Sequence, residues 1–580
     1  MQATRKNWTT FQPITEEASN SLAGYKPFMQ QLLFNRGIKD AAAAESYLNG
    51  SVLGEDPFHL LDMDKAVDRL LKAADRGETV AVYGDYDVDG VSATALMVEV
   101  LRSFGINAYP YIPNRFEEGY GLNLDAIEML ADSGVTLILT VDCGIRSLAE
   151  ADFARSKQVD LIISDHHFPK EELPSALAVI DPKRENDAYI YKDLAGVGLA
   201  YKIAEALFTR RNTNSRNAEE WLDLVALGTV SDIVPLTGEN RTLVKRGLGM
   251  IRTGRRLGIS SLLRAARKDP FRITASDIGF ILGPRLNAAG RMDSAKQALN
   301  LLLTNDALEA VSLAQKLDNQ NMERQNLTKD LQSWIAEKST DLEGRYLISD
   351  VSLAEFDYSS YKTTSGAGIM GLVAAKLVES YYRPAVIGTE EGDLIKASCR
   401  SIPEFHITKA LDECADLLVR HGGHSMAAGF TVRKENAGAL LEKLQQIAEQ
   451  QLIGQDLKLT LRADMEFSIN DLPGDALDQL KRLEPTGQSN PEARFISRNV
   501  EIKDVRKIGK DQSHLKFKIP YRNGTLEAVA WKQGHWADEM PGKVDLFYSV
   551  EENTYGNLVT TQLNVRDLQP ASDSALSSGS

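Results

Sequence analysis

The sequence predicts an α/β fold built on a parallel sheet, followed by a second α/β domain and a small C-terminal β-barrel. Three observations support this prediction. Short apolar runs alternate with amphipathic stretches over the first 180 residues. Polar and acidic residues directly follow several of these runs. From about Leu457 onward the pattern becomes a period-two alternation with turn signals such as Asn523-Gly524, which is typical of an all-β domain.

The first domain is expected to alternate strands with helices in the order of a doubly wound sheet. The carboxyl ends of parallel strands share one edge, where open α/β sheets bind their ligands. Residues that are dozens of positions apart in sequence should therefore meet there. Strands are expected at 79–84, 107–113, 135–141, 159–164 and 176–180, and helices at 92–104, 124–133 and 147–157.

Three of these strands end in polar clusters. The segment GDYDVDG at 84–90 presents three aspartates, VDCG at 141–144 presents one, and SDHH at 164–167 adds an aspartate and two histidines. So many carboxylates repel one another unless a divalent cation lies among them. Oxygen and imidazole ligands suit Mn²⁺ or Mg²⁺ better than zinc. The number of acids indicates two ions about 3.5–4 Å apart, as in phosphoryl hydrolases.

Other interpretations exist for each cluster taken separately. Residues 85–90 copy the start of an EF-hand calcium loop, but that loop needs a preceding helix and a glutamate at its twelfth position, where this chain has Leu96. A solvated acidic turn would also explain GDYDVDG, and a helix cap or surface histidine would explain the His pair. Convergence on one sheet edge favours the metal site.

Composition bounds the function. With 580 residues, 43% of them hydrophobic, the chain should form three or four domains. Its three cysteines, Cys143, Cys399 and Cys414, have neither an even count nor metal-binding spacing, which indicates a reduced intracellular protein. No signal peptide or membrane span is recognisable, so we expect a soluble cytoplasmic protein that does not bind membranes.

The net charge of −15 argues at first against a nucleic-acid enzyme. However, the stretch from Arg241 to Arg272 holds ten Lys or Arg and one acid, Asp269. Such a run is consistent with an electrostatic track for a phosphodiester chain. A solvated helical face is the alternative.

The second half of the chain has three recognisable parts. Apolar spacing over 306–338 predicts one long amphipathic connecting helix. Residues 345–454 repeat strand and helix signals and include the glycine-rich HGGHSMAAG, whose amides could approach a phosphate. The all-β part fits an oligonucleotide-binding barrel, in which Trp531, Trp536, Tyr548 and Tyr555 could stack on bases or form core. A disordered tail, ASDSALSSGS, is expected at the end.

These motifs together resemble a known family. GDYDVDG, VDCG and SDHH are similar to the successive motifs of the DHH phosphoesterase superfamily. The further matches resemble its RecJ branch of single-strand-specific 5′ to 3′ exonucleases, including the companion DHHA1 domain and the segment that leads into an OB barrel. They are IPNRFEEGYGL at 112–122, AGVGLAYK at 195–202, GTVSDIVPL at 228–236, GPRLNAAGRM at 283–292, ASCRSIPEFHITKAL at 397–411, HGGHSMAAGF at 421–430 and LEPTGQSNP at 483–491.

The resemblance implies roles for particular residues. The metal ligands would be Asp85, Asp87, Asp142, His166 and Asp232, with Asp142 as the bridging carboxylate. His167 would face the scissile phosphate, and Asp89 would support the site. The pocket for the terminal phosphate would be formed by Arg115, Ser398 and Arg400. Arg285, Asn287 and Arg291 would contact the strand or brace the site, and His424 would be a further substrate-binding residue.

The family also implies an organisation and a function. We expect a monomeric exonuclease of DNA repair and recombination that binds single-stranded DNA and meets single-strand-binding protein and a RecQ-type helicase. A DHH phosphodiesterase of short oligonucleotides or cyclic dinucleotides, and a non-catalytic RecJ-like scaffold, remain the alternatives. The expected parts are an N-terminal segment (1–54), a DHH domain (55–300), a connecting helix (301–344), a DHHA1 domain (345–454), an OB-fold (455–568) and a tail (569–580).

Two segments depart from the family pattern. Ser365-Gly366-Ala367 stands where a Trp-His pair is usual, and Thr486 and Ser489 replace an aromatic residue and a glycine in LEPTGQSNP. Both departures lie outside the expected metal centre. They bear on how the second α/β domain contacts a nucleotide.

Overall fold

A computed structural model describes residues 6–50, 54–114, 118–119, 121–212, 217–292, 294–338, 345–361, 366–555 and 558–571. The chain divides into two compact units, each formed from segments that are separate in sequence. The larger unit comprises Glu55–Asp232 and Gly247–Leu457, and the smaller unit comprises Met1–Gly54, Ile233–Arg246 and Lys458–Ser580. The expected candidate metal ligands all belong to the larger unit.

The larger unit begins with the expected parallel sheet, whose five strands lie in the order β3-β2-β4-β5-β6. The chain leaves β2 through a helix to reach β3 on one side, and it later returns to β4 on the other side of β2. The carboxyl ends of β2 and β4 therefore flank a topological switch point, the usual ligand position in such sheets. The strands are β2 (Thr79–Gly84), β3 (Asn107–Tyr111), β4 (Leu137–Val141), β5 (Asp160–Ser164) and β6 (Ala178–Ile180).

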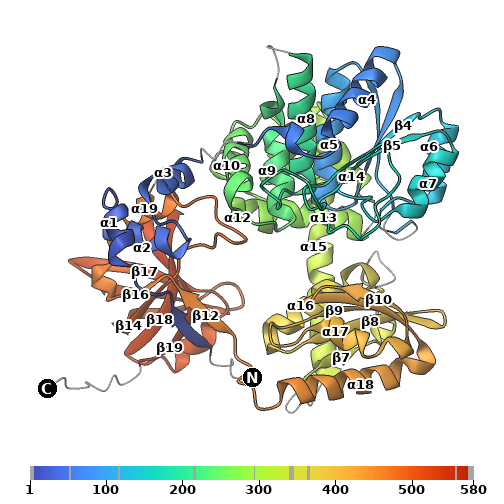
Figure 1. Ribbon diagram of the computed structural model, residues 1–580. Coiled ribbons are helices and arrows are strands. Elements are labelled where there is room, and N and C mark those ends of the chain that lie inside the picture. The colour runs from blue at the N-terminus through green and yellow to red at the C-terminus, as the bar shows by residue number, and fades with distance from the viewer. Residues whose placement is uncertain are drawn as a thin grey trace. The chain divides into compact units, whose positions relative to one another are not determined.

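Helices cover both faces of this sheet (Figure 1). One face packs on α6 (Leu124–Asp132) and α7 (Leu148–Ser156). The other packs on α5 (Val88–Ser103) and α8 (Gly196–Arg211), and α5 is also in contact with α9 (Leu222–Ser231). Because both faces are covered, the strands read as continuous apolar runs, as β4 does with all five residues buried.

The expected elements of this domain are confirmed, with most boundaries within two residues of the prediction and one further away. Helix α5 begins at Val88, four residues before the expected start at Ser92. Asp87 is its N-cap and accepts hydrogen bonds from the backbone amides of Asp89 and Gly90, so the acidic segment forms the helix start rather than a loop.

The remainder of the larger unit is helical and then α/β. The long connecting helix is confirmed as α15 (Ala307–Lys338), which packs against α11 and α13. Beyond it lies a five-stranded sheet of order β10-β11-β9-β8-β7. The other elements before this sheet are α4 (Met63–Arg76), α11 (Leu257–Ala265), α12 (Ala275–Asp277), the π-helical turn η4 (Ile278–Leu282), α13 (Gly283–Met292) and α14 (Lys296–Leu303). Helix α10 (Gly238–Arg252) begins in the smaller unit and ends in the larger one. The second domain contains β7 (Ile348–Asp350), α16 (Met370–Tyr381), β8 (Ala385–Glu391), β9 (Leu394–Arg400), α17 (Ile407–Asp412), β10 (Leu418–Gly423), β11 (Ala427–Arg433) and α18 (Lys434–Leu452).

The smaller unit contains the expected C-terminal β domain, a seven-stranded sheet of order β13-β14-β18-β19-β17-β16-β15. The alternation expected from His514 is observed along β16, whose side chains are alternately buried and half-buried. The strands are β12 (Thr460–Ala463), β13 (Met465–Glu466), β14 (Phe495–Glu501), β15 (Lys503–Ile508), β16 (His514–Tyr521), β17 (Gly524–Ala530), β18 (Lys543–Tyr555) and β19 (Leu558–Pro570), with the helix α19 (Ala476–Lys481).

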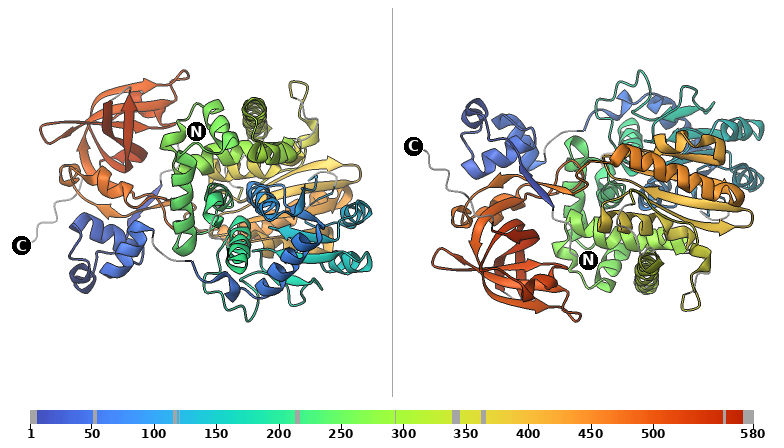
Figure 2. Two further views of the ribbon diagram at one scale, coloured as in Figure 1. Left: turned by 90° about the horizontal axis from the view of Figure 1, so that it is seen from above. Right: turned by 90° about the horizontal axis from the view of Figure 1, so that it is seen from below.

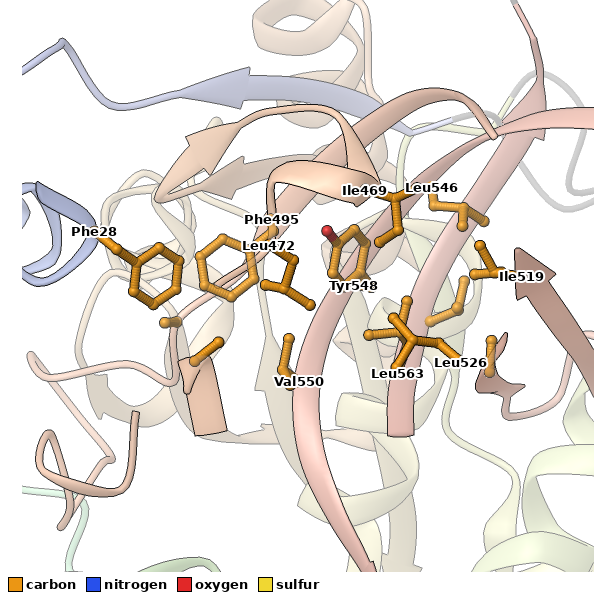
Figure 3. Close-up of a cluster of buried hydrophobic side chains, with 14 of the residues drawn as sticks. Phe28, Ile469, Leu472, Phe495, Ile519, Leu526, Leu546, Tyr548, Val550 and Leu563 are labelled. Atoms are coloured by element: carbon orange, nitrogen blue, oxygen red, sulfur yellow. The ribbon is translucent and has the colours of Figure 1, made fainter. Parts of the chain in front are cut away.

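The N-terminal segment packs on this β domain, as Figures 1 and 2 both show. Its strand β1 (Asn7–Thr10) pairs in parallel with β12, and its helices α2 (Pro27–Asn35) and α3 (Ala41–Asn49) add apolar side chains to the barrel core, as does Leu22 directly after α1 (Glu16–Ser21). Phe28 of α2 stacks on Phe495 with ring centroids 5.5 Å apart (Figure 3). The first fifty residues thus complete a core that the C-terminal residues begin.

Arg241 holds three segments of the smaller unit together. Its guanidinium is buried and donates to the backbone carbonyls of Tyr47, Glu484 and Pro485, and it stacks on the Tyr47 ring at 3.9 Å. The carbonyls of Glu484 and Pro485 belong to the LEPTGQSNP segment. Each of the three guanidinium nitrogens therefore donates a hydrogen bond inside the fold.

The basic stretch 241–272 is only partly the electrostatic track that its composition indicates. Besides Arg241, at least five members have partners inside the protein: Lys245, Arg252, Arg255, Arg256 and Lys268. Arg256, for example, lies between Glu99 and Asp223 at 2.9 and 2.6 Å. The exposed members are Arg246, Arg255, Arg264, Arg267, Lys268 and Arg272. Sequence spacing could not separate these groups, because the partners lie far away along the chain.

The barrel aromatics also divide. Trp531 is half exposed, whereas Tyr548 is fully buried and Trp536 is packed against the core. The side chain of Tyr555 and the tail from residue 572 lie outside the described residues. All three cysteines are buried and free. Among the helices that the structure describes, none is both long and apolar enough to span a membrane.

Candidate metal centre

Four aspartates stand in a row along the edge of the parallel sheet. The last residues of β2, β4, β5 and β6 are partners in register, from Gly84 to Val141, Ser164 and Ile180. The residue after each of them is an aspartate. The row is Asp85, Asp142, Asp165 and Asp181. The parallel ladder thus brings together carboxylates from positions almost a hundred residues apart.

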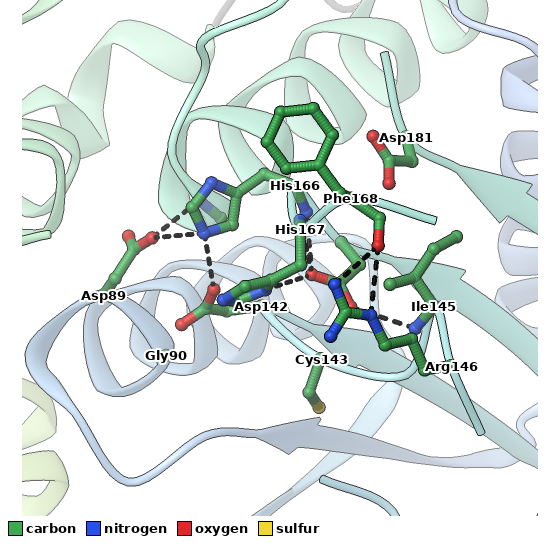
Figure 4. A network of polar contacts seen from close by, with 12 residues as sticks. Asp89, Gly90, Asp142, Cys143, Ile145, Arg146, His166, His167, Phe168 and Asp181 are labelled. Atoms are coloured by element: carbon green, nitrogen blue, oxygen red, sulfur yellow. Dashed lines mark hydrogen bonds and ion pairs between the residues drawn. The ribbon is translucent and has the colours of Figure 1, made fainter. Parts of the chain in front are cut away.

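His166 faces the carboxylates of this edge from the turn after β5 (Figure 4). Its Nε2 lies 3.1 Å from Asp142 Oδ1, 3.6 Å from Asp232 Oδ2 and 3.9 Å from Asp89 Oδ2. Ligand atoms of Asp85, Asp87 and Asp142 also lie within 4.8 Å of one another. The structure therefore brings together all five residues that the sequence comparison with the family marks as metal ligands.

The electrostatics of the cluster fit a bound cation. Burial and the surrounding carboxylates raise the pKa of Asp142 well above its usual range, and the same two causes raise the pKa of Asp232 to about 9. Burial lowers the pKa of His166 to about 3, so its imidazole is neutral, which is the form that binds metals. Carboxylates held this close gain from a cation that replaces their protons. The oxygen-rich donor set matches Mn²⁺ or Mg²⁺.

Asp89 has a different environment from the other aspartates of GDYDVDG. Its two carboxylate oxygens accept hydrogen bonds from the backbone amides of Gly196 and Val197, at 2.6 and 2.9 Å, and its side chain is completely buried. Burial raises its pKa to about 7. Asp89 therefore caps the N-terminus of α8 and holds that helix against the cluster, which is the supporting position expected for it.

Two glycines let the backbone approach these carboxylates. A Cβ at Gly196 would lie 2.5 Å from the Asp142 Cβ, and one at Gly228 would lie 2.7 Å from Asp89 Oδ1. The motifs AGVGLAYK and GTVSDIVPL each supply one of them, and the latter also carries Asp232 as the C-cap of α9. Sequence reasoning missed these glycines, although their place inside the matched motifs was a usable signal.

His167 is oriented by Asp165. Its Nδ1 lies 2.7 Å from Asp165 Oδ1, and the other oxygen of this buried carboxylate accepts from the amide of Ile145 at 2.9 Å. Burial lowers the pKa of His167, but the hydrogen bond to Asp165 and the neighbouring Asp89 and Asp87 raise it overall. The imidazole is half exposed and favours the cationic form, which suits a group that binds a phosphate oxygen.

Asp181 is a buried carboxylate that the sequence did not single out. It is fully buried at the end of β6, accepts one hydrogen bond from the amide of Lys183, and has an Oδ2 without a hydrogen-bond partner among the described residues. Burial raises its pKa to about 7. Asp181 directly follows β6, which has only three residues, and the end of so short a strand is hard to predict from sequence.

Ser398 and Arg400 come together in the second domain, beside the start of α16. Arg400 donates from Nη1 to Ser398 Oγ at 3.3 Å, and no carboxylate pairs with it in the described part of the chain. A Cβ at Gly371 would lie 2.8 Å from Arg400 Nη2. A half-buried guanidinium, a hydroxyl and the second residue of a helix thus surround one spot, an arrangement suited to a phosphate group.

The remaining expected contact residues have varied environments. Arg285 donates to Asp318 and to the carbonyl of Ile281, so its charge is already balanced. Arg291 donates to the carbonyl of Gly368 at 3.2 Å and links α13 to the segment before α16. His424 is exposed at the tip of the β10–β11 hairpin, and Asn287 is half-buried on α13. Arg115 and Ser365 lie outside the described residues.

Comparison with protein families finds three domain models in the chain. Residues 79–229 match the DHH family N-terminal domain, residues 348–450 the DHHA1 domain, and residues 463–567 the RecJ OB domain. The all-β part is therefore of the OB type.

Full-length relatives agree. The chain is 34% identical to the single-stranded-DNA-specific exonuclease RecJ of Bacillus subtilis, over 98% of this chain and 71% of that protein. It is 33% identical to the protein of the same name from Escherichia coli, over 96% of this chain and 98% of that one.

Solved structures agree as well. A crystal structure of RecJ from Thermus thermophilus in complex with Mn²⁺ superposes with a TM-score of 0.81 and 27% identity, covering 97% of this chain and 79% of that one. The corresponding Mg²⁺ complex gives a TM-score of 0.76, again at 27% identity, and covers 97% and 78%.

Proposed function

This chain belongs to the RecJ family of single-stranded-DNA-specific exonucleases, and from this we propose that it removes nucleotides from the 5′ end of single strands and releases 5′-mononucleotides. It is a metal-dependent exonuclease of DNA repair and recombination that uses Mn²⁺ or Mg²⁺. The observation that carries the proposal is a cluster in which Asp142 lies beside two sets of donors, His166 with Asp232 on one side and Asp85 with Asp87 on the other.

We propose that the metals are held by Asp85, Asp87, Asp142, His166 and Asp232. Bound there, two divalent ions would activate water as a nucleophile and stabilise charge on the scissile phosphate. The chain itself keeps His166 neutral by burial and presents its Nε2 to the carboxylates. Asp142, within reach of both groups of ligands, is the natural bridging residue.

The protein contributes further through residues that do not bind metal. Asp165 fixes the ring of His167 so that the cationic imidazole can donate to a phosphate oxygen as negative charge develops on it. Asp89 acts as a positioning residue, because its carboxylate is committed to the amides at the start of α8. Asp89 therefore holds the ligand cluster together without direct contact with the substrate.

The 5′ polarity follows from a separate anchor for the strand end. Ser398, Arg400 and the start of α16 would hold the terminal phosphate, with Arg115 as the family's further contributor. Because this anchor would lie at a fixed distance from the metals, each cleavage would release one nucleotide. We further propose that the protein acts as a monomer in the cytoplasm with single-strand-binding protein and a RecQ-type helicase, consistent with its free cysteines.

A nuclease assay tests the proposal. Long single strands labelled at the 3′ end, carrying a 5′-phosphate, are incubated with Mn²⁺ and the protein or its Asp142→Asn variant. The proposal expects labelled strands that shorten progressively from the 5′ end, 5′-mononucleotides as product, and no reaction with the variant. Cleavage of dinucleotides only would favour a phosphodiesterase of small substrates, and binding without cleavage would favour a scaffold.

A further inference from the structure

Helix α15 carries a line of polar residues on its buried face. Asp318, Asn321 and Arg324 follow one another at intervals of three, which places them along one side of a helix. Arg285 of α13 donates from Nε to Asp318 Oδ1 at 2.8 Å, and Arg324 donates from Nη2 to Asn321 Oδ1 at 2.9 Å. The α13–α15 packing thus contains two arginines and one aspartate.

The charges of this group do not balance. Asp318 is paired with Arg285, and no carboxylate pairs with Arg324 within the residues that the structure describes. Burial lowers the pKa of Arg324, and the nearby Arg285 lowers it further. A partly buried cation without a counter-ion is costly, so a ligand that brings negative charge would bind favourably there.

This part of α15 also carries buried hydrogen-bond donors without acceptors among the described residues. Asn321 is fully buried, and its Nδ2 finds no acceptor in the described chain; the same holds for the buried Nε of Arg324. Buried donors are normally satisfied, so each exception requires a reason. Two donors and one surplus positive charge are together complementary to an anion rich in oxygen atoms.

The position of the group connects it with the catalytic machinery. On α13, Gly290 approaches the GDYDVDG segment, where its Cβ would lie 2.9 Å from the carbonyl oxygen of Tyr86. The next residue, Arg291, reaches the carbonyl of Gly368 just before α16. The helix that adjoins Arg324 therefore contacts both the metal-ligand segment and the segment beside Ser398 and Arg400 (Figure 1).

Arg324 and Arg400 have similar electrostatic environments. Both guanidinium groups are largely buried, both have their pKa lowered by burial, and neither has a carboxylate partner among the described residues. Arg285, by contrast, resembles a structural arginine because Asp318 neutralises it. Of the arginines on α13 and α15, Arg324 is thus the better candidate for a ligand contact.

We propose that Arg324, held in place by Asn321, binds an internal phosphate of the single strand being degraded. This inference rests on the proposed function, since it names a contact for the same substrate. Guanidinium groups bind phosphate oxygens in a fixed geometry, and one internal contact would help to keep the strand aligned between the terminal-phosphate pocket and the metals. Arg324 is a binding residue in this account and takes no part in the chemical step.

The proposal differs from a structural role in the direction of its effect on stability. If Arg324 served only to hold α15, its replacement would lower the melting temperature. As an anion-binding residue it burdens the DNA-free protein with a buried cation, so neutral Gln at this position should leave the melting temperature unchanged or raise it.

The test measures DNA binding by the full chain without divalent cations, so that no cleavage occurs. Binding of 5′-phosphorylated oligo-dT is followed by fluorescence anisotropy from 50 to 200 mM salt for the wild type, Arg324→Gln, Arg324→Lys and the control Lys329→Gln, which removes an exposed charge on the same helix. We expect Arg324→Gln to weaken binding roughly tenfold and to reduce the salt slope by about 0.7, with an unchanged or higher melting temperature. Arg324→Lys should keep the wild-type slope, and Lys329→Gln should behave as the wild type.

Two results would overturn the inference: an unchanged salt slope for Arg324→Gln, or a lower melting temperature that accounts for its weaker binding. Degradation of the same DNA by the wild type with Mn²⁺ is measured in parallel. If the wild type degrades DNA but Arg324→Gln binds normally, only this inference fails. If the wild type does not degrade DNA, the proposed function fails.

Discussion

We expect Asp142→Asn to be more stable than the wild type without metal and less stable than the wild type with metal. Asp142 has a φ of 64°, a left-handed conformation that Asn tolerates well, so the substitution keeps the backbone. Gln would be longer, and Ala would be strained there. Asn removes the charge while preserving the shape of the side chain against Gly196.

The magnitude follows from the distances in the cluster. Ligand atoms of Asp142 lie within 4.8 Å of those of Asp85 and Asp87. Two unit charges about 4 Å apart repel by about 4 kcal/mol at an effective dielectric constant of about 20. Burial and these neighbours raise the pKa of Asp142 in the folded protein. The folded protein without metal therefore loses stability relative to the unfolded chain as pH rises above the pKa that Asp142 has in the unfolded chain. We expect the metal-free variant to exceed the wild type in free energy of unfolding by about 2–4 kcal/mol at pH 8 and by less at pH 5.

Mn²⁺ should then favour the wild type. A ligand at one hundred times its Kd stabilises a protein by about 2.7 kcal/mol, and a variant that lacks the bridging carboxylate should gain little at the same concentration. Urea unfolding of both proteins at pH 5 and 8, with EDTA or with Mn²⁺, measures these free energies. Equal stabilisation of both proteins by Mn²⁺, or a metal-free variant less stable than the wild type, would refute the assignment of this cluster as the metal centre.

Three further substitutions test other parts of the site. Gly196→Ala places a Cβ 2.5 Å from the Asp142 Cβ, so kcat should fall at least about tenfold while the melting temperature stays within a few degrees; an active variant would contradict the close packing. Burial raises the pKa of Asp181 to about 7, so the wild type should lose up to about 4 kcal/mol of stability as pH rises from about 4 to 7. Asp181→Asn should not show this loss. The idea is refuted if urea unfolding gives the same change in stability with pH for both proteins. Arg400→Lys should raise KM roughly tenfold for 5′-phosphorylated strands but not for 5′-hydroxyl strands, as measured by initial rates, and equal effects on both substrates would exclude a terminal-phosphate pocket.

Local pattern was sufficient for the sheet and for those members of the cluster that directly follow its strands. Each strand of the first domain is an apolar run followed by a polar turn, and the parallel arrangement brings all carboxyl ends to one edge. Asp85, Asp142 and His166 could therefore be placed together without knowing any distance. Asp232 was different, since it follows a helix, and only the resemblance to the RecJ family pointed to it.

Local pattern was not sufficient where a side chain chooses among distant partners. The segment GDYDVDG does not show what Asp89 supports, and in the structure both its carboxylate oxygens accept from the start of α8, more than a hundred residues later. Arg285 looked like a DNA contact, yet Asp318 on α15 neutralises it. Arg241 looked like part of a basic track, yet it donates to the backbone carbonyls of Tyr47 and Pro485, which lie far from it in the sequence on either side. Each choice depends on which helices pack together.

The sequence by itself thus determined the α/β architecture, the sheet edge that carries the site and the chemistry of its donors. Periodicity and strand-end acids are local properties, and a parallel sheet converts them into proximity. The tertiary structure decided which carboxylates remain available for metal, which arginines remain uncompensated, and that the first fifty residues complete the C-terminal barrel. These outcomes depend on burial and on partners distant in sequence, because the free energy of a charged or apolar group is set by its surroundings in the folded protein.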